Sequence, residues 1–107
     1  MAAVRVSIIA WVDDHQPGFV RCELQDAWDR VWSFVEKAPV LSAAELWNDS
    51  SYPQPGVIAC EIVRRWVDDR GRHIMTIDTS RPWGVETEAG ETTFDVLPTQ
   101  MESEASV

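Results

Sequence analysis

The sequence predicts a mainly β protein, a small antiparallel barrel or sandwich of about six strands. Three observations lead to this fold class. Short runs rich in β-branched and aromatic residues recur along the chain, several of them alternate apolar and polar side chains, and glycine, proline or aspartate separates most of them. We expect a single globular β domain over residues 1–98 and a loose acidic tail over 99–107, which has too little apolar content to order itself.

The first two expected strands form a hairpin. Residues 4–12 alternate apolar and polar side chains, which is typical of a half-buried strand. The opposite face of this strand carries Ile9 and Trp11 and is therefore partly apolar. Residues 17–18, proline and glycine, suit the centre of a type II turn. Residues 19–24 then form a second strand that pairs back on the first.

Residues 24–41 support two interpretations. A helix over 26–37, capped by Asp26, would place apolar residues at helical spacing and give an α+β fold with that helix on an antiparallel sheet. The same segment is rich in aromatic and β-branched residues, and a helix does not easily continue through Pro39. We therefore favour a strand over 30–41 and keep the helix as the alternative.

One short helix is expected near residues 42–48. Ser42 and Glu45 have the spacing of a capping box, in which two side chains satisfy free backbone N–H groups at the start of a helix. The two alanines between them are strong helix formers. A polar cluster at residues 48–51 follows at once, so the helix has to be short.

The second half of the chain continues as strands separated by turns. A stiff loop with two prolines and a glycine leads into a long run rich in β-branched residues, and the stretch from Asp69 to Arg72 is a hairpin signal. A turn at 88–90 precedes the last strand. The expected strands are residues 57–67, 73–79 and 93–97, with a short run at 83–87.

The net charge of −9 is unevenly distributed along the chain. From Asp78 to Val107, seven acidic residues stand against Arg81 alone, a net of −6, which leaves −3 for the first 77 residues. Such acidity disfavours nucleic acid and anionic membranes as partners, because both carry negative charge, and it attracts basic proteins. The sequence therefore predicts another protein, of basic character, as the partner.

The sequence also carries indications of the compartment. Nothing near the start resembles a signal peptide, and no window approaches the roughly 18 consecutive apolar residues of a membrane span. The only cysteines, Cys22 and Cys60, lie in runs that alternate apolar and polar residues. A cytoplasmic protein with reduced, packed thiols is the simplest interpretation, and a disulfide would require their strands to be neighbours.

No motif for catalysis, a cofactor or a metal ion is evident, and we expect neither cofactor nor metal. Cys22, Cys60, His15 and His73 are too far apart in sequence for the short ligand pairs of known zinc sites. Pairing about the 69–72 turn would set His73 near Val67 or Asp68, well away from Cys60, so a cysteine–histidine nucleophile is disfavoured. The acidic pairs at residues 13–14 and 68–69 have the character of turn residues.

Three features indicate recognition rather than catalysis. Trp83 stands between a proline and a glycine, where regular strand packing would not easily bury it. Acidic residues surround it in sequence, and Tyr52 lies on the proline-stiffened loop. Tryptophan and tyrosine are frequent anchors at protein interfaces. The candidate binding residues are Tyr52, Asp78, Trp83, Glu86, Glu88 and Glu91.

The primary functional hypothesis is a non-enzymatic, small acidic protein-binding module, an inhibitor or immunity-type partner of a basic protein. Bacterial immunity proteins and other small inhibitors share this size, charge and fold class, an analogy of general character that no motif supports. One alternative is a homo-oligomeric structural or scaffold subunit that uses the partly apolar face around Ile9 and Trp11. Another is a small enzyme or ligand carrier with its site in a barrel mouth.

Overall fold

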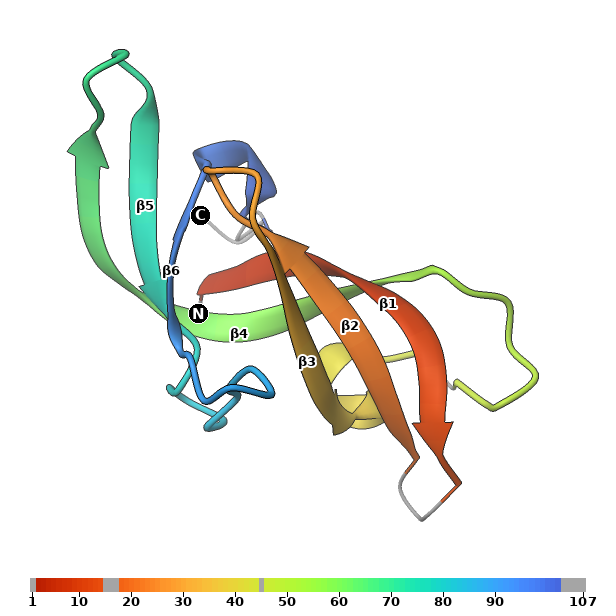
Figure 1. Ribbon diagram of the computed structural model, residues 1–107. Helices are drawn as coiled ribbons and strands as arrows, with labels where there is room; N and C mark the ends of the chain where they lie inside the picture. Colours follow the sequence, from red (N-terminus) through yellow and green to blue (C-terminus); the bar gives the residue numbers. More distant parts are fainter. Residues whose placement is uncertain (1, 15–17, 45, 103–107) are drawn as a thin grey trace.

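The computed structural model describes residues 2–14, 18–44 and 46–102 and confirms the predicted fold class. Six antiparallel strands form one sheet that curls into a half-barrel, with one short helix and a 3-10 turn (Figure 1). The elements are β1 (Ala2–Asp13), β2 (Phe19–Gln25), β3 (Val31–Lys37), α1 (Ala38–Leu41), β4 (Gln54–Val67), β5 (His73–Asp78), β6 (Thr93–Val96) and η1 (Pro98–Gln100).

The long strand β4 connects the two halves of the sheet, whose order is β3-β2-β1-β4-β5-β6. Its first half pairs with β1, ending where Cys60 lies opposite Ala2. Its second half pairs with β5, from Glu61 opposite Asp78 to Val67 opposite His73. The backbone of the far end of the β4–β5 hairpin therefore extends beyond β1 and projects from the sheet (Figure 1).

Apolar side chains from both halves of the sheet fill its concave face. The alternation predicted for the first strand is confirmed, because Val4, Val6 and Ile8 are buried. Phe94 of β6 packs edge-on against Phe34 of β3 with ring centroids 5.6 Å apart. Aromatic packing therefore joins the two outermost strands and leaves the inner face filled.

Two backbone hydrogen bonds also join the opposite ends of the sheet. Ala27 N–H donates to the Asp95 carbonyl at 2.8 Å, and Glu88 N–H donates to the Ser33 carbonyl at 3.2 Å. The turn after β2 and the segment before β6 thus cover parts of the exposed edges of β6 and β3, respectively. Covering a free edge in this way removes unpaired backbone groups that would otherwise attract another strand.

The strand favoured for residues 30–41 is confirmed for 31–37, and the alternative helix over 26–37 does not form. Asp26 acts as a turn residue rather than as a helix cap, because its carboxylate accepts hydrogen bonds from the backbone N–H groups of Trp28 and Arg30, both at 2.9 Å. Asp29, at φ 63°, turns the chain back toward β2.

The short helix lies earlier than predicted, at 38–41 instead of near 42–48. Pro39 begins this helix rather than excluding it, because the fixed φ of proline suits the first helical turn. The Ser42 hydroxyl accepts a hydrogen bond from Ala44 N–H at 3.1 Å, so it shapes a local turn. Glu45, the other half of the predicted capping box, lies outside the described residues.

Other boundaries differ modestly from the predictions. Residues 83–87 form no strand and belong to a loop between β5 and β6. The expected tail is tied to β1 through residue 102, since Glu102 N–H donates to the Ala3 carbonyl at 2.7 Å. The turn predicted at 17–18 falls largely outside the described residues. In the described ranges, no helix is long and apolar enough to cross a membrane.

Candidate functional site

The segment that joins β5 to β6, residues 78–92, is here called the acidic loop. A fully buried threonine, Thr79, holds its base together. The Thr79 hydroxyl donates to the Val85 carbonyl at 2.7 Å, and its backbone N–H donates to the Thr92 carbonyl at 2.9 Å. Val85, also fully buried, returns a hydrogen bond to the Thr79 carbonyl at 3.0 Å. The loop is therefore ordered, and Val85 joins it to the main hydrophobic core.

Asp78, at the start of the acidic loop, shapes its first turn. Its Oδ1 atom accepts hydrogen bonds from the backbone N–H of Ser80 at 2.9 Å and from the Ser80 hydroxyl at 2.7 Å. These bonds lower the pKa of the Asp78 carboxyl below its ordinary value, because they favour the charged form. The carboxylate that the sequence marks as a binding candidate thus already has partners within the turn.

Trp83 is displayed at the tip of this turn. Trp83 is 66% exposed, the largest value among the large apolar residues that are exposed. Gly84 follows at φ 65°, a conformation that glycine adopts without strain, and its N–H donates to the Ser80 carbonyl at 2.8 Å. The backbone on both sides of Trp83 is thus fixed while its indole faces solvent. Among the described residues, this indole makes no hydrogen bond or ring contact.

The remaining acidic candidates follow Trp83 along the acidic loop. Glu86 and Glu91 are exposed, and neither side chain forms an ion pair with another described residue. Glu88 is also exposed but lies 3.5 Å from the Arg21 guanidinium of β2. Thr87 is buried between them, and its hydroxyl accepts the Glu91 N–H at 2.9 Å. The structure thus brings the predicted acidic residues and Trp83 onto one ordered loop.

Tyr52 is not part of that surface. Its hydroxyl donates to the Trp47 carbonyl at 2.7 Å, and its ring packs against the core. It precedes the start of β4 at Gln54, whereas the acidic loop begins beside Glu61, seven residues further along this strand. Seven residues of strand span roughly 23 Å. Tyr52 and Trp83 therefore lie at different ends of this part of β4.

A second surface, which the sequence does not reveal, surrounds two other tryptophans. Trp28, in the turn between β2 and β3, packs against Trp66 of β4 with ring centroids 6.2 Å apart. The Arg72 guanidinium lies 5.3 Å from the Trp28 ring, and that of Arg64 lies 5.0 Å from the Trp66 ring. These four residues are here called the tryptophan–arginine cluster. Arginine over an aromatic face is a favourable cation–π arrangement.

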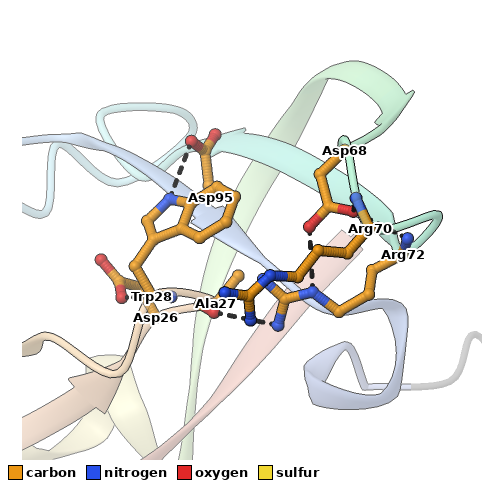
Figure 2. A network of polar contacts seen from close by, with 7 residues as sticks. All are labelled: Asp26, Ala27, Trp28, Asp68, Arg70, Arg72 and Asp95. Carbon is orange, nitrogen blue, oxygen red and sulfur yellow. Dashed lines mark hydrogen bonds and ion pairs between the residues drawn. The ribbon is translucent and has the colours of Figure 1, made fainter.

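Polar contacts hold this cluster in place, and Figure 2 shows those of Trp28 and Arg72. The Asp95 carboxylate accepts a hydrogen bond from the Trp28 indole at 3.3 Å and another from the Thr76 hydroxyl at 2.6 Å. Thr76 in turn accepts the Trp66 indole N–H at 3.0 Å. The carboxylate of Asp95 thus connects the turn after β2 directly to β5 and, through Thr76, to Trp66 of β4.

An ion pair completes the attachment of the hairpin. Arg72 donates to the Asp68 carboxylate at 2.9 Å and to the Ala27 carbonyl at 3.3 Å (Figure 2). Desolvation raises the pKa of Asp68, but hydrogen bonds from Arg72 and from the backbone N–H of Arg70 outweigh it and hold this pKa below its ordinary value. The Asp68 contacts are local to the turn, whereas the bond from Arg72 to the Ala27 carbonyl depends on the tertiary fold, so residue spacing could not predict it.

The cysteines lie in inert positions. Burial raises the pKa of Cys22 to about 12 and that of Cys60 to about 11, so both thiols remain protonated near neutral pH. Both are free, on strands separated by β1. His73 lies opposite Val67, as predicted, and far along β4 from Cys60. His15 falls outside the described residues, and the remainder contains no metal-binding group of three or more ligands.

The partly apolar face of the first strand is half covered by its own chain. Trp11 lies directly against Gly18, where a β-carbon would come within 1.9 Å of the ring. Its indole also donates to the Asp14 carboxylate at 2.6 Å. Ile9 is half-buried as well. The face around Ile9 and Trp11 therefore offers less free apolar surface than its sequence indicates.

Two of the surfaces described above combine an exposed tryptophan with charged side chains: the acidic loop and the tryptophan–arginine cluster. The Trp83 indole makes no hydrogen bond or ring contact with the described residues, whereas Trp28 is 44% exposed and hydrogen-bonds to Asp95. The acidic loop is therefore the better candidate for recognition. Comparison of the chain with models of known protein families, with curated proteins and with solved structures finds no match.

Proposed function

We propose that the protein is a non-enzymatic protein-binding module that docks through its acidic loop on a basic partner. The observation that carries this proposal is the exposed indole of Trp83 on a loop whose own hydrogen bonds already fix its shape. Tryptophan is the most enriched type of residue at binding hot spots. A surface ordered before binding loses less conformational entropy when the partner arrives.

The charge of the loop supports a basic partner. Glu86 and Glu91 are exposed near Trp83 in sequence and have no ion-pair partner among the described residues. Unpaired carboxylates on the same loop as an apolar anchor attract a basic surface and repel acidic competitors. Replacing these two glutamates should mainly change the rate of association and its salt dependence, and should affect the packing around Trp83 less.

The finer form of the proposal is an inhibitor or immunity-type protein that acts in the cytoplasm. A small protein with a preformed loop can inhibit a partner by covering part of its surface, without any chemical reaction. The two free, buried cysteines suit a reducing compartment. The filled inner face of the half-barrel gives less support to a ligand carrier with its site in the barrel mouth.

The test is capture of partners from cells that make the protein, with Trp83→Ala compared against Trp47→Ala. Trp47 is a matched control because it is 54% exposed and lies in a different loop. Removing a hot-spot indole typically weakens binding by about 2 kcal/mol or more, roughly 30-fold. We expect Trp83→Ala to lose the partner and Trp47→Ala to retain it.

Charge reversal provides the second arm of this test. Glu86→Lys with Glu91→Lys should weaken capture in low salt and make the remaining binding less sensitive to added salt. Circular dichroism and urea unfolding confirm that each variant is folded. Equal capture by wild type and Trp83→Ala would show that the acidic loop is not the binding surface.

A further inference from the structure

The far end of the β4–β5 hairpin differs in charge from the rest of the molecule. Residues 63–75, here called the basic hairpin, contain four of the nine lysines and arginines of the chain and only two acidic residues. The net charge of this segment is +2, which leaves −11 for the remainder. The protein thus carries a local basic projection on an otherwise acidic body (Figure 1).

The basic hairpin also exposes apolar surface. Val63 is 58% exposed and Val67 is 54% exposed, with exposed Arg65 between them. No described segment pairs with this half of β4 on the side away from β5, because β1 ends opposite Cys60. Valine favours strands, but a valine side chain exposed to water contributes little hydrophobic free energy to folding.

The basic hairpin is nevertheless attached to the rest of the sheet by the tryptophan–arginine cluster. Arg64 and Arg72 are engaged on the two tryptophan rings, and Asp95 anchors the cluster from β6. Two other arginines remain for a partner: the side chains of Arg65 and Arg70 form no ion pair with the described residues. The basic hairpin is therefore held in place by the cluster and still carries two exposed arginines, Arg65 between the exposed valines and Arg70 at the turn beside Ala27 and Trp28 (Figure 2).

We propose that the partner of this surface is the acidic loop of a second copy of the chain. This inference rests on the proposed function, because it assigns a partner to the same loop. Arg65 and Arg70 complement Glu86 and Glu91 in charge, and the exposed valines complement Trp83 as apolar surface. The acidic loop of one copy thus offers carboxylates and an indole, and the basic hairpin of the other offers guanidinium groups and valine side chains.

The placement of the two patches allows both contacts to form at once. The basic hairpin lies at the His73 end of β5 and the acidic loop begins at its Asp78 end, roughly 17 Å apart along the strand. A two-fold axis that lies outside the molecule, perpendicular to β5 and level with its middle, exchanges these ends. In such a closed dimer, each hairpin meets the loop of the other copy, which doubles the contact without producing an open chain of subunits.

Direct pairing of the two hairpins by their free edges is the competing arrangement. It would place Arg64 and Arg65 of one copy beside the same residues of the other, and like charges opposite each other destabilise strand pairing. The irregular register between Ile62 and Arg64 also interrupts this edge. Bulges and charged residues are common devices that prevent such pairing. Charge thus favours docking on the acidic loop.

Sedimentation equilibrium on the purified chain tests the proposal by charge exchange. The first variant carries Arg65→Glu with Arg70→Glu, and the second carries Glu86→Arg with Glu91→Arg. We expect wild type to form dimers at low salt, and each variant alone to dimerise about tenfold more weakly or worse. An equimolar mixture should restore dimers, because both contacts in the mixed dimer again join opposite charges.

A third variant tests the apolar component without altering charge. Val63→Thr with Val67→Thr keeps the β-branched shape and should weaken the dimer by several-fold. Monomers at every concentration and salt level would overturn the dimer but not the acidic loop as a surface for another protein, which capture through Trp83 tests separately. Dimers that survive both charge variants, or variants that fail to complement each other, would overturn the assignment of the two surfaces.

Discussion

Aspartate carboxylates at the ends of strands shape this molecule. Asp26, Asp68 and Asp78 each accept backbone N–H groups of the turn that follows them. The sequence predicts this role for Asp68, since aspartate is a common turn residue. It does not show that Asp26 also accepts the indole of Trp32 at 2.9 Å, because that contact depends on the fold of β3.

Asp95 is the individual residue with the clearest expected effect on stability. Asp95→Ala removes the acceptor of both Trp28 and Thr76, and should lower the free energy of unfolding by about 1.5 kcal/mol. Urea unfolding measures this as a lower midpoint with an unchanged slope. Asp69→Ala, at an exposed turn position, should change the free energy by less than about 0.5 kcal/mol. Equal effects would show that the Asp95 contacts contribute no net stability.

Trp83 and Tyr52 show how far the placement of individual candidate residues can be predicted. The proline and glycine beside Trp83 indicate that it does not enter a regular strand, and the structure exposes it. The same reasoning places Tyr52 on a stiff loop, but its hydroxyl meets a backbone carbonyl five residues earlier. Local sequence predicts that a residue is in a loop, whereas the partner of its side chain depends on how the loop closes.

Among the elements, strands with regular alternation are the most predictable. The first, second and last strands lie within a few residues of their predicted limits, because their apolar residues recur with the period of a strand. The short helix is misplaced, because Pro39 is compatible both with ending a strand and with beginning a helix. Propensity alone does not distinguish these roles.

The sharing of β4 between two halves of the sheet is not evident from the sequence. The run predicted as one strand is indeed one strand, but it changes neighbour between Cys60 and Glu61. No residue type marks that change. It lies where the pairing of β4 with β1 stops, at Ala2 opposite Cys60, and beyond this point β4 pairs with β5 alone among the described strands.

The acidic loop is the element whose order the proposed function requires. Thr79→Val keeps the shape of the buried side chain but leaves the Val85 carbonyl without its donor, at a cost of about 2 kcal/mol. Hydrogen exchange should then become faster at the amides of Val85 and Gly84, while the amides of β1 and β2 remain protected.

A matched control for this variant is Thr93→Val, at an exposed position of β6. It removes a hydroxyl of the same kind and should leave exchange in the acidic loop unchanged. Unaltered exchange in Thr79→Val would indicate that backbone contacts alone hold the loop. The hydroxyl would then have no part in presenting Trp83.

The whole molecule combines a neutral core with an uneven surface. Aromatic packing between β3 and β6 closes the half-barrel, and the tryptophan–arginine cluster attaches the projecting hairpin to it. This arrangement sets a basic projection and an acidic loop on the same rigid sheet. The excess of arginine at residues 63–75 is visible in the sequence, but only the fold shows that this segment projects from the sheet.

The most direct test of the acidic loop as a docking surface is photo-crosslinking in the cells that make the protein. Trp83, or Trp47 as the control, is replaced by a photoreactive phenylalanine derivative, and the products are separated by mass. We predict a discrete light-dependent adduct from position 83 and none from position 47. An adduct of twice the 12.1 kDa chain mass would identify a second copy, and any other single mass a different protein. No adduct at position 83, or the same products from both positions, would contradict a binding role for this loop.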